Sequence, residues 1–524
     1  MLFYGILSTI RTELEGVFMK SLVTKHQYKD YDTDQQYLLP LHMRDWLPKD
    51  HMVFFIIRQV EAMDLSAFDK LPTNAKGQPP YHYRMMVTII LYAYSLGITS
   101  SRIIEQKTYE ESAFRIASGD QHPDFRTIST FRKDNLPALS RLFTTQLVYL
   151  HHKDLLPLEV VSQDGTKIQA NASSHKNLGY EKMLQKETLL TEALRMSQKI
   201  LADAAEVDRL EDQSFGKKEN PYLLKVPPKY QNAPIEEIQK ELKQVQDLID
   251  QTREENQTLQ QEQQKEQQNQ LSKENQNNPN KKNKPNKKPG KNKQAKQVMP
   301  LSPREIEPDP ATKRNRTDFD SRLMKSGSNG GYFQAFNVQL AMDHYCGLIA
   351  GMQVTQDHND QHQTIPMMNQ LQKQFSKLPK QYLADKGYAN EKNFTFLTEQ
   401  RVDAFVATPA PRGSKTEKEE KENQEAKNQV NGYTGRSGFN LVELMRLKLK
   451  SNHGKEMYKI RGWLSEGPFG YFKQTLRFTQ FSFRGKEKIE KEALLRGLGY
   501  NLCKLYRLQL KSPFIREKLS LNPG

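Results

Sequence analysis

Two aspartates in this sequence each follow a short run of residues typical of a buried strand. Asp164 comes directly after Val-Val-Ser-Gln, and Asp385 ends the run Tyr-Leu-Ala-Asp. A single aspartate at a strand end is usually a turn former or a helix cap. At neighbouring strand ends of one sheet, two carboxylates lie roughly 5 Å apart and repel each other unless a cation sits between them. This pair is therefore a candidate cation site.

A third carboxylate, Glu466, lies in the stretch YKIRGWLSEGPFGYFK. In a helix, its offset of seven residues from Lys473 would place both side chains on one face. Because proline is tolerated only in the first turn of a helix, Pro468 predicts a helix that begins close to Ser465. The polar side chains expected around that helix start are Tyr458, Arg461, Glu466 and Lys473.

Strand and helix patterns alternate around the two aspartates. Residues 331–354 predict two strands joined by a turn near 343–347, and a helix follows at 361–378. The strand that ends at Asp385 precedes a further helix and a further strand. This alternation predicts an α/β domain over residues 155–410, with one large insertion.

The insertion, residues 177–314, breaks the alternating pattern. It predicts two amphipathic helices, at 181–212 and 234–261, and the apolar residues of the second come close to a heptad. We expect these helices to form a hairpin that projects from the α/β domain. Apolar residues then disappear, so residues from about 262 to 298 are expected to lack packed structure.

A lysine-rich tract lies at the end of this polar segment. Residues 273–297 contain nine lysines and one glutamate, so they carry +8 of the chain's formal charge of +16. Such a tract can hold DNA electrostatically without reading its sequence. It can equally be a solvated linker. The basic excess is therefore not by itself evidence for a shaped binding groove.

The N-terminal part of the chain, residues 35–150, reads as a series of helices. One of them, SRIIEQKTYEESAFRIAS, is expected to begin at Ser100 or Ser101 and to end near Gly119. The following stretch, HPDFRTISTFRK, interleaves basic residues with threonine and serine, which suits a helix-turn-helix-like DNA-binding module. An ordinary helical bundle is the alternative. The basic residues expected to contact DNA are Arg126, Arg132 and Lys133.

The overall composition narrows the class of protein. The 524 residues carry a formal charge of +16, which favours a polyanionic partner, with nucleic acid first and a membrane surface second. The two cysteines form no CxxC pair, which argues against a zinc site and against a disulfide framework, and fits a reducing cytoplasm. No stretch approaches the roughly 20 apolar residues needed to span a bilayer. Either Met1 or Met19 can be the true start.

Several motifs resemble the DDE transposases of bacterial insertion sequences, and more narrowly the IS-four superfamily and its IS-eleven-eighty-two group. The resemblance covers most of residues 35–176 and 315–510. The spacing from Arg461 to Glu466 is one residue longer than in the superfamily's Tyr-Arg-Glu-Lys signature, and a charged stretch at 411–433 replaces the cysteine-rich loop of many relatives. The matching pieces are HPDFRTISTFRK, SQDGTKIQANAS, GYFQAFNVQLAMD, VTQDHNDQ, LADKGY and YKIRGWLSEGPFGYFKQ with FSFRG.

The resemblance implies a ribonuclease-H-like core with Asp164 on the first strand, Asp385 after the fourth and Glu466 on a late helix. These three would be the catalytic residues and would hold two divalent ions, Mg²⁺ or Mn²⁺. Arg461 and Lys473 would contact phosphates, and Tyr458 would donate a hydrogen bond to one. Three further positions match the family but have no assigned chemistry: Asn337, Gln339 and Asp360. Asp360 is interpreted as a cap of the helix that follows it.

The expected fold is an α/β ribonuclease-H-like catalytic core with an N-terminal all-helical domain and a helical and disordered insertion. The expected partner is double-stranded DNA, both as the terminal inverted repeats and as the target. A second copy of the chain is expected to bind the same DNA. The expected location is the cytoplasm, at the nucleoid, and no membrane is expected as a partner. The expected divisions are an N-terminal extension (1–34), a helical DNA-binding domain (35–150), the first strand of the core (151–176), the insertion (177–314), the rest of the core (315–510) and a C-terminal tail (511–524).

Three function classes follow. The first is an active transposase that cleaves insertion-sequence ends and transfers the strands. The second is a catalytically inactive or domesticated DNA-binding scaffold derived from such an enzyme. A third is an RNA-binding or membrane-surface protein that depends on the lysine tract. The intact set of Asp164, Asp385 and Glu466 favours the active enzyme.

Overall fold

The computed structural model describes residues 42–69, 79–211, 234–276, 307–326, 330–409 and 441–519. The chain forms two compact units, Met1–Lys49 and Asp50–Gly524. The described part of the first unit holds one short 3-10 helix, η1 (Met43–Trp46). All of the predicted site residues belong to the second unit.

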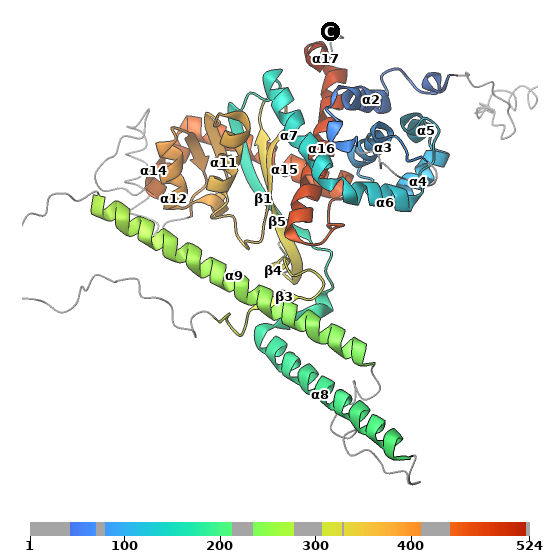
Figure 1. The fold of residues 1–524 in the computed structure, drawn as a ribbon. Coiled ribbons are helices and arrows are strands. Elements are labelled where there is room, and N and C mark those ends of the chain that lie inside the picture. Colours follow the sequence, from blue (N-terminus) through green and yellow to red (C-terminus); the bar gives the residue numbers. More distant parts are fainter. Residues whose placement is uncertain are drawn as a thin grey trace, which may run out of the picture. The chain divides into compact units, whose positions relative to one another are not determined.

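A mixed sheet of six strands forms the core of the second unit (Figure 1). β1 pairs antiparallel with β5 on one side and parallel with β7 on the other, and β8 pairs parallel with β7. β5 pairs with β4 along its first residues and with β6 along its later ones. As a result β1, β7 and β8 point in the same direction, and β1 continues to Gln169, beyond the ends of β7 and β8. The strands are β1 (Val160–Gln169), β4 (Arg322–Lys325), β5 (Tyr332–Asp343), β6 (Ile349–Thr355), β7 (Gln381–Ala384) and β8 (Asp403–Val406).

The strands form because their side chains are buried under helices. Ten consecutive residues of β5 are buried, as expected for a strand covered on both faces. On one face, Leu383 of β7 and Phe405 of β8 pack against Met457 and Leu464 of α15 (Asn452–Gly470). This packing fixes α15 across the parallel part of the sheet. Three more helices contact β6 or β8: α11 (Thr364–Phe375), α12 (Glu391–Glu399) and α14 (Leu441–Lys450).

The N-terminal helices appear where the sequence predicted them, with one difference. The stretch predicted as a single helix is divided at Glu111 into α4 and α5. Ser100 caps α4 by accepting a hydrogen bond from Ile103 N, and Gly119 ends α5 in the left-handed conformation. The helices are α2 (Met52–Ala62), η2 (Ser66–Phe68), α3 (Tyr83–Ser95), α4 (Ser101–Glu110), α5 (Ser112–Ser118), α6 (Phe125–Asp134) and α7 (Leu136–His152).

A long helix, α16 (Lys486–Lys511), joins the helical region to the sheet. It packs against α3 and α7 and also against β6, where the Asn501 side chain bonds to both backbone groups of Ile349. The two regions therefore share one buried helix. The short α17 (Pro513–Leu519) follows α16. None of the described helices is long and apolar enough to cross a membrane.

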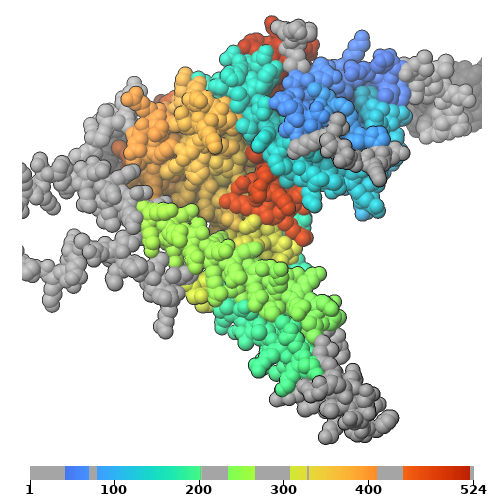
Figure 2. All heavy atoms as spheres, in the orientation of Figure 1, coloured from blue at the N-terminus to red at the C-terminus, as the bar shows by residue number. Residues whose placement is uncertain are grey.

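The two predicted helices of the insertion are α8 (Tyr180–Glu211) and α9 (Ile235–Gln276). They pack through a common apolar cluster, and Figure 2 shows α9 adjoining the segment of β3 and β4 in yellow. Glu255 of α9 pairs there with Arg314 and Arg322. At the base of the insertion, η3 (Ser174–Lys176) precedes β2 (Asn177–Gly179), which pairs with β3 (Lys313–Asn315).

The expectation that packed structure ends near residue 262 is wrong for its first part, because α9 continues as a helix to Gln276. Glutamine, glutamate and lysine are good helix formers, so a loss of apolar residues does not by itself end a helix. Residues 277–298, with eight of the nine lysines of the tract, lie outside the described residues. The same holds for the charged stretch 411–433.

Candidate active site

Asp164 and Asp385 are brought together by two adjacent parallel strands: Asp385 directly follows β7, and Asp164 lies within β1, which continues to Gln169. In the register of β1 and β7, Gln163 lies opposite Ala384, and each aspartate is the next residue along its strand. One guanidinium nitrogen, Arg461 Nη2, lies 3.0 Å from Asp164 Oδ2 and 3.8 Å from Asp385 Oδ2. The predicted adjacency of the two strands is confirmed, and one cation already lies between the carboxylates.

The local backbone orients both carboxylates in the same way. Asp164 Oδ1 accepts a hydrogen bond from Gly165 N at 2.8 Å. Asp385 caps the short helix η4 (Lys386–Tyr388), with its Oδ1 accepting from Gly387 N. In each residue one carboxylate oxygen is held by the main chain, and the other is left for the cation at the centre of the site.

The electrostatics of the site favour a positively charged ligand. The pKa of Asp164 is raised to about 6, mainly by burial and also by the Asp385 and Asp360 carboxylates, while Arg461 opposes the shift. Burial also raises the pKa of Tyr458, which lies beside the same groups, with its ring 6.0 Å from the Arg461 guanidinium. A neighbouring cation would stabilise the charged form of Asp164.

Helix α15 delivers Tyr458 and Arg461 to the site. A buried hydrogen bond of 3.1 Å between the hydroxyls of Ser162 and Ser465 fastens α15 to β1. Glu466 follows Ser465 in this helix, but its side chain lies outside the described residues. The third predicted carboxylate is therefore placed only as far as its backbone.

The prediction that this helix begins near Ser465 is wrong, because α15 begins at Asn452 behind the cap Ser451 and contains Pro468 in its last turn. One lost hydrogen bond near a helix end is tolerable when the flanking packing is strong. A π-helical turn, η5 (Tyr471–Thr475), follows directly and carries Lys473. Since π-helical geometry changes the side-chain phase, the seven-residue spacing does not correspond to two regular α-helical turns.

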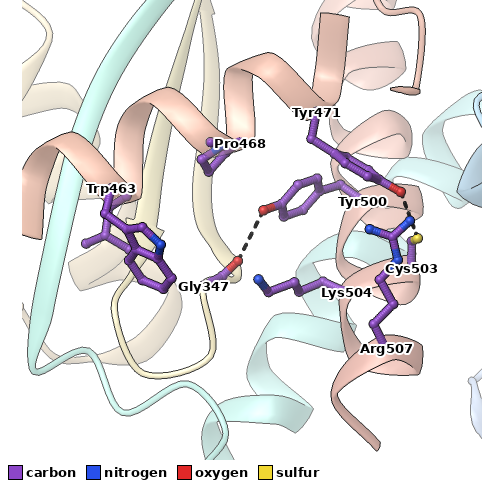
Figure 3. Close-up of a pocket in the computed structure, with 10 residues that line it drawn as sticks. Gly347, Trp463, Pro468, Tyr471, Tyr500, Cys503, Lys504 and Arg507 are labelled. Carbon is purple, nitrogen blue, oxygen red and sulfur yellow. Dashed lines mark hydrogen bonds between the residues drawn. The ribbon is translucent and has the colours of Figure 1, made fainter. Parts of the chain in front are cut away.

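A cavity of about 230 Å³ separates the end of α15 and η5 from α16 (Figure 3). Within it, the Tyr471 hydroxyl and Cys503 Sγ are 2.9 Å apart, and the Arg507 guanidinium lies 4.9 Å from the Tyr471 ring. Tyr500 donates to the carbonyl oxygen of Gly347 at 3.3 Å. Neither Asp164 nor Asp385 lines this cavity. The described residues that line it therefore support η5 and are not part of the carboxylate site.

The structure also shows a buried amide network that the sequence analysis did not assign. The Tyr382 hydroxyl donates to Gln163, Gln163 donates to Gln339 at 3.1 Å, and Gln339 donates to Asp360 Oδ1 at 2.6 Å. Asn337 donates to the same Asp360 oxygen. The signal in the sequence was the presence of glutamines within otherwise apolar strands. Such residues must find partners when buried.

Asp360 does not cap the helix that follows it, contrary to the expectation. The N-cap of α11 is Gln363, and no side chain caps that helix. The Asp360 carboxylate instead turns back over the sheet toward Asn337 and Gln339 of β5. The side-chain amides of Asn337 and Gln339 on β5 bind the Asp360 carboxylate in place of the backbone N–H groups at the start of α11.

The basic residues of α6 divide into two groups. Arg126 and Lys133 are exposed, as a phosphate contact requires. Arg132 is only 8% exposed and donates to the Tyr94 hydroxyl and to Thr99 O. Its burial leaves it little surface for DNA, so we assign Arg132 to the packing of α6 on the core.

The described residues fit a divalent cation. Carboxylate oxygens are the ligands preferred by Mg²⁺, and Asp164 and Asp385 already share one positive partner. Glycines at 165 and 387 let the carboxylate oxygens approach the backbone closely, since an added Cβ would meet Asp360 Oδ1 at 2.6 Å or Asp385 Oδ1 at 3.0 Å. Among the described side chains, no three acidic, histidine or cysteine groups form a complete ligand set.

Two family models match the chain. "Transposase domain (DUF772)" matches residues 41–134, which cover α2 to α6, and "Transposase DDE domain" matches residues 311–502, which include Asp385 and α15. No curated protein and no solved structure matches. The two models together cover α2 to α6 and strands β3 to β8, whereas α7 and β1 with Asp164 lie outside both matches. The chain therefore belongs to the DDE transposases of insertion sequences, a pairing of domains consistent with the IS-four superfamily and its IS-eleven-eighty-two group.

Proposed function

We propose that this chain catalyses metal-dependent cleavage of DNA at insertion-sequence ends and joins the freed strands to target DNA. The observation that carries the proposal is the convergence of Asp164 and Asp385 on one cation, where β7 ends beside the middle of the parallel strand β1. Two carboxylates in that arrangement suit phosphodiester chemistry, in which negative charge develops at both the attacking and the leaving oxygen.

The topology of the sheet supports a ribonuclease-H-like core. The strands follow the order β6-β5-β1-β7-β8, with β5 antiparallel to β1 and with β7 and β8 parallel to it. Asp164 lies on the first of these strands in the chain, and Asp385 follows the fourth. This placement agrees with the positions that the family resemblance implies for the first two catalytic carboxylates.

The proposed reaction has two displacement steps at phosphorus. In the first, a water oxygen attacks the phosphodiester at the transposon end, the P–O3′ bond breaks, and a 3′-hydroxyl and a 5′-phosphate remain. In the second, that 3′-hydroxyl attacks a target phosphodiester, a new P–O3′ bond forms, and a target 3′-hydroxyl leaves. Each attacking oxygen loses one proton to solvent, and each leaving oxygen gains one.

The residues around the site have separate roles in this proposal. Asp164, Asp385 and Glu466 would hold two divalent ions, Mg²⁺ or Mn²⁺, which supply activation of the attacking oxygen and stabilisation of the leaving oxygen. Arg461 reaches the same carboxylates and can pair with a phosphate beside them. Tyr458 can donate a hydrogen bond to that phosphate, and Lys473 can neutralise one on the next turn.

The helical region would bind the DNA at some distance from the bond that reacts. Arg126 and Lys133 are exposed on α6, and Thr127, Ser129 and Thr130 are exposed between them. Hydroxyls and cations on one short helix suit phosphate contacts, which position a duplex without reading its sequence. We further propose that two copies of the chain act together on the paired ends, in the cytoplasm at the nucleoid.

The test is nicking of a labelled duplex that carries the transposon end, with and without Mg²⁺. The wild-type chain should produce one 3′-hydroxyl at the end of the element only when the metal is present. An Asp385→Asn variant should bind the duplex equally well without metal and should leave it intact. Binding without nicking by the wild-type chain, across Mg²⁺ and Mn²⁺, would instead establish the inactive scaffold.

A further inference from the structure

A third described carboxylate, Asp360, lies near Asp164 and Asp385, beside the glycines that follow them closely in the chain, Gly165 and Gly387. It belongs to the loop between β6 and α11, and its negative charge contributes to the raised pKa of Asp164. Burial raises the pKa of Tyr388, and the same three carboxylates add to that rise. The electric fields of the three carboxylates therefore overlap at one place in the protein.

The position of Asp360 depends on two glycines. An added Cβ at Gly165 would meet Asp360 Oδ1 at 2.6 Å and Gln339 Nε2 at 2.3 Å, so no other residue fits there without displacing the carboxylate. At Gly387, an added Cβ would lie 3.0 Å from Asp385 Oδ1 and 3.4 Å from Asp360 Oδ2. Oxygens of Asp360 and Asp385 thus border the same small space.

Within the part of the chain that the structure describes, the Asp360 carboxylate accepts hydrogen bonds through one of its two oxygens. Asn337 Nδ2 and Gln339 Nε2 both donate to Oδ1, at 2.8 and 2.6 Å. The other oxygen, Oδ2, is the one that faces Gly387. An oxygen held by two amides fixes the direction of its partner oxygen, as outer hydrogen bonds do for carboxylates at metal sites.

The loop around Asp360 is clamped by further amides. Asn390 and Asn393 both donate to Gln361 O, and Gln163 donates to Gln363 O. A carboxylate held this firmly beside two others raises their mutual repulsion, which destabilises the folded protein unless a cation compensates. Strained electrostatics of this kind are typical of functional sites.

We propose that Asp360 is a functional residue of the cation site, where its fixed negative charge strengthens the binding of a divalent ion by Asp164 and Asp385. This inference rests on the proposed function. The three carboxylates carry three negative charges against the one positive charge of Arg461, which leaves two negative charges for a divalent ion to balance. Asp360 acts here as a positioning residue through its charge and needs no direct bond to the ion.

The test measures Mn²⁺ binding to the full chain without DNA, by calorimetry, so that it does not depend on nicking. Asp360→Asn keeps an oxygen that can accept from Asn337 and Gln339 and removes only the charge. We expect its Mn²⁺ affinity to fall about 10- to 100-fold, the range found for residues that support metal ligands. Thermal melting in a chelator should show a melting temperature equal to or above that of the wild type, because one repulsive charge is gone.

Asp357→Asn is the matched control. Asp357 lies three residues away in the same loop and accepts a hydrogen bond from Gln363, but it is not among the groups that raise the pKa of Asp164. Its variant should bind Mn²⁺ as the wild type does. Asp360→Ser serves as a second variant should the amide misfold, and the same loss of affinity is expected from it.

The outcomes separate this inference from the proposed function. Weaker Mn²⁺ binding by both Asp164→Asn and Asp360→Asn, with Asp357→Asn unchanged, supports the role of Asp360. Wild-type affinity in both Asp360 variants, with a loss in Asp164→Asn, overturns the role of Asp360 and leaves the cation site intact. Wild-type affinity in Asp164→Asn would remove the cation site itself, and the inference with it.

Discussion

Ser162 of β1 and Ser465 of α15 share a buried hydrogen bond of 3.1 Å between their hydroxyls. The first serine lies two residues before Asp164, and the second directly precedes Glu466. This single contact ties the strand that carries one predicted catalytic carboxylate to the helix that carries another. We therefore expect it to set the relative position of the two residues.

Removal of one of these hydroxyls should affect both stability and nicking. Ser465→Ala leaves the Ser162 hydroxyl buried without a partner, which should cost about 1–3 kcal/mol of unfolding free energy. The double variant Ser162→Ala/Ser465→Ala should recover much of this loss, since no orphaned hydroxyl remains. Denaturant titrations of the single and double variants measure the coupling. Strictly additive losses would show that the two hydroxyls do not interact.

Asp164→Asn should separate DNA binding from cleavage. The substitution keeps the size of the side chain and removes the charge, so end binding in the absence of metal should persist, while nicking falls by orders of magnitude. Asp154→Asn is a suitable control, because Asp154 is exposed and pairs with Lys518 rather than with a residue of the site. Nicking of Asp164→Asn at the wild-type rate would disprove the two-metal interpretation.

The stability of the metal-free protein should depend on the charge of Asp164. Its pKa is about 6 in the folded protein, against 3.8 ordinarily, so the folded state holds this proton more tightly than the unfolded chain. The resulting penalty is complete above pH 6 and vanishes as the pH falls below about 4. In a chelator, Asp164→Asn should be more stable than the wild type at pH 8, by on the order of 2 kcal/mol.

The comparison across pH isolates Asp164 from other buried acids. Burial also raises the pKa of Asp343 to about 6, but that group titrates equally in both proteins and cancels in the difference. Melting temperatures of wild type and variant should therefore converge between pH 8 and pH 4. A difference that stays constant over this range would contradict the raised pKa.

Arg461→Gln should change metal binding and cleavage in opposite directions. Loss of the guanidinium removes the positive charge 3.0 Å from Asp164, so the DNA-free protein should bind Mn²⁺ several-fold more tightly. Nicking should nevertheless fall at least tenfold, because the phosphate loses a charged donor. Arg461→Lys keeps the charge and should bind Mn²⁺ like the wild type. Unchanged metal affinity in Arg461→Gln would show that this cation does not compete for the carboxylates.

Deletion of residues 273–297 should weaken binding to every DNA sequence alike. The tract carries nine lysines, and each phosphate they neutralise releases counterions. The dependence of affinity on salt should therefore become less steep, while Mg²⁺-dependent nicking is retained at low salt. Binding titrations at several salt concentrations provide the measurement. A change in preference between transposon-end and unrelated duplexes would indicate sequence readout by the tract instead.

The sequence predicted the strands of the site well, because hydrophobic runs and turn residues are local signals. β5, β6, β7 and β8 all appear where these signals placed them, and the adjacency of the two aspartates follows from the α/β alternation. The start of α15 was mispredicted because a local rule for Pro468 was applied, whereas the packing of Met457 and Leu464 on the sheet decides where that helix runs.

Two side chains could not be placed from local patterns at all. Arg132 looks like a DNA contact in its basic, hydroxyl-rich stretch, yet its partners Tyr94 and Thr99 lie 38 and 33 residues away. Asp360 looks like a helix cap, yet its partners Asn337 and Gln339 lie on a strand 21 to 23 residues before it. In both residues, the competing partner comes from tertiary structure, which single-sequence reasoning does not contain.

The insertion between β1 and β5 has a consequence for how the protein is made. Leu158, just before β1, donates to Asp343 at the end of β5, a partner 185 residues later in the chain. A ribosome that adds about 5–20 residues per second leaves β1 without that neighbour for roughly 10 to 40 s. Throughout this interval the nascent chain exposes an unpaired apolar strand edge. Synthesis of β5 and β7 must therefore precede any assembly of the carboxylate site, and chaperone binding to the waiting segment should be measurable on stalled ribosomes.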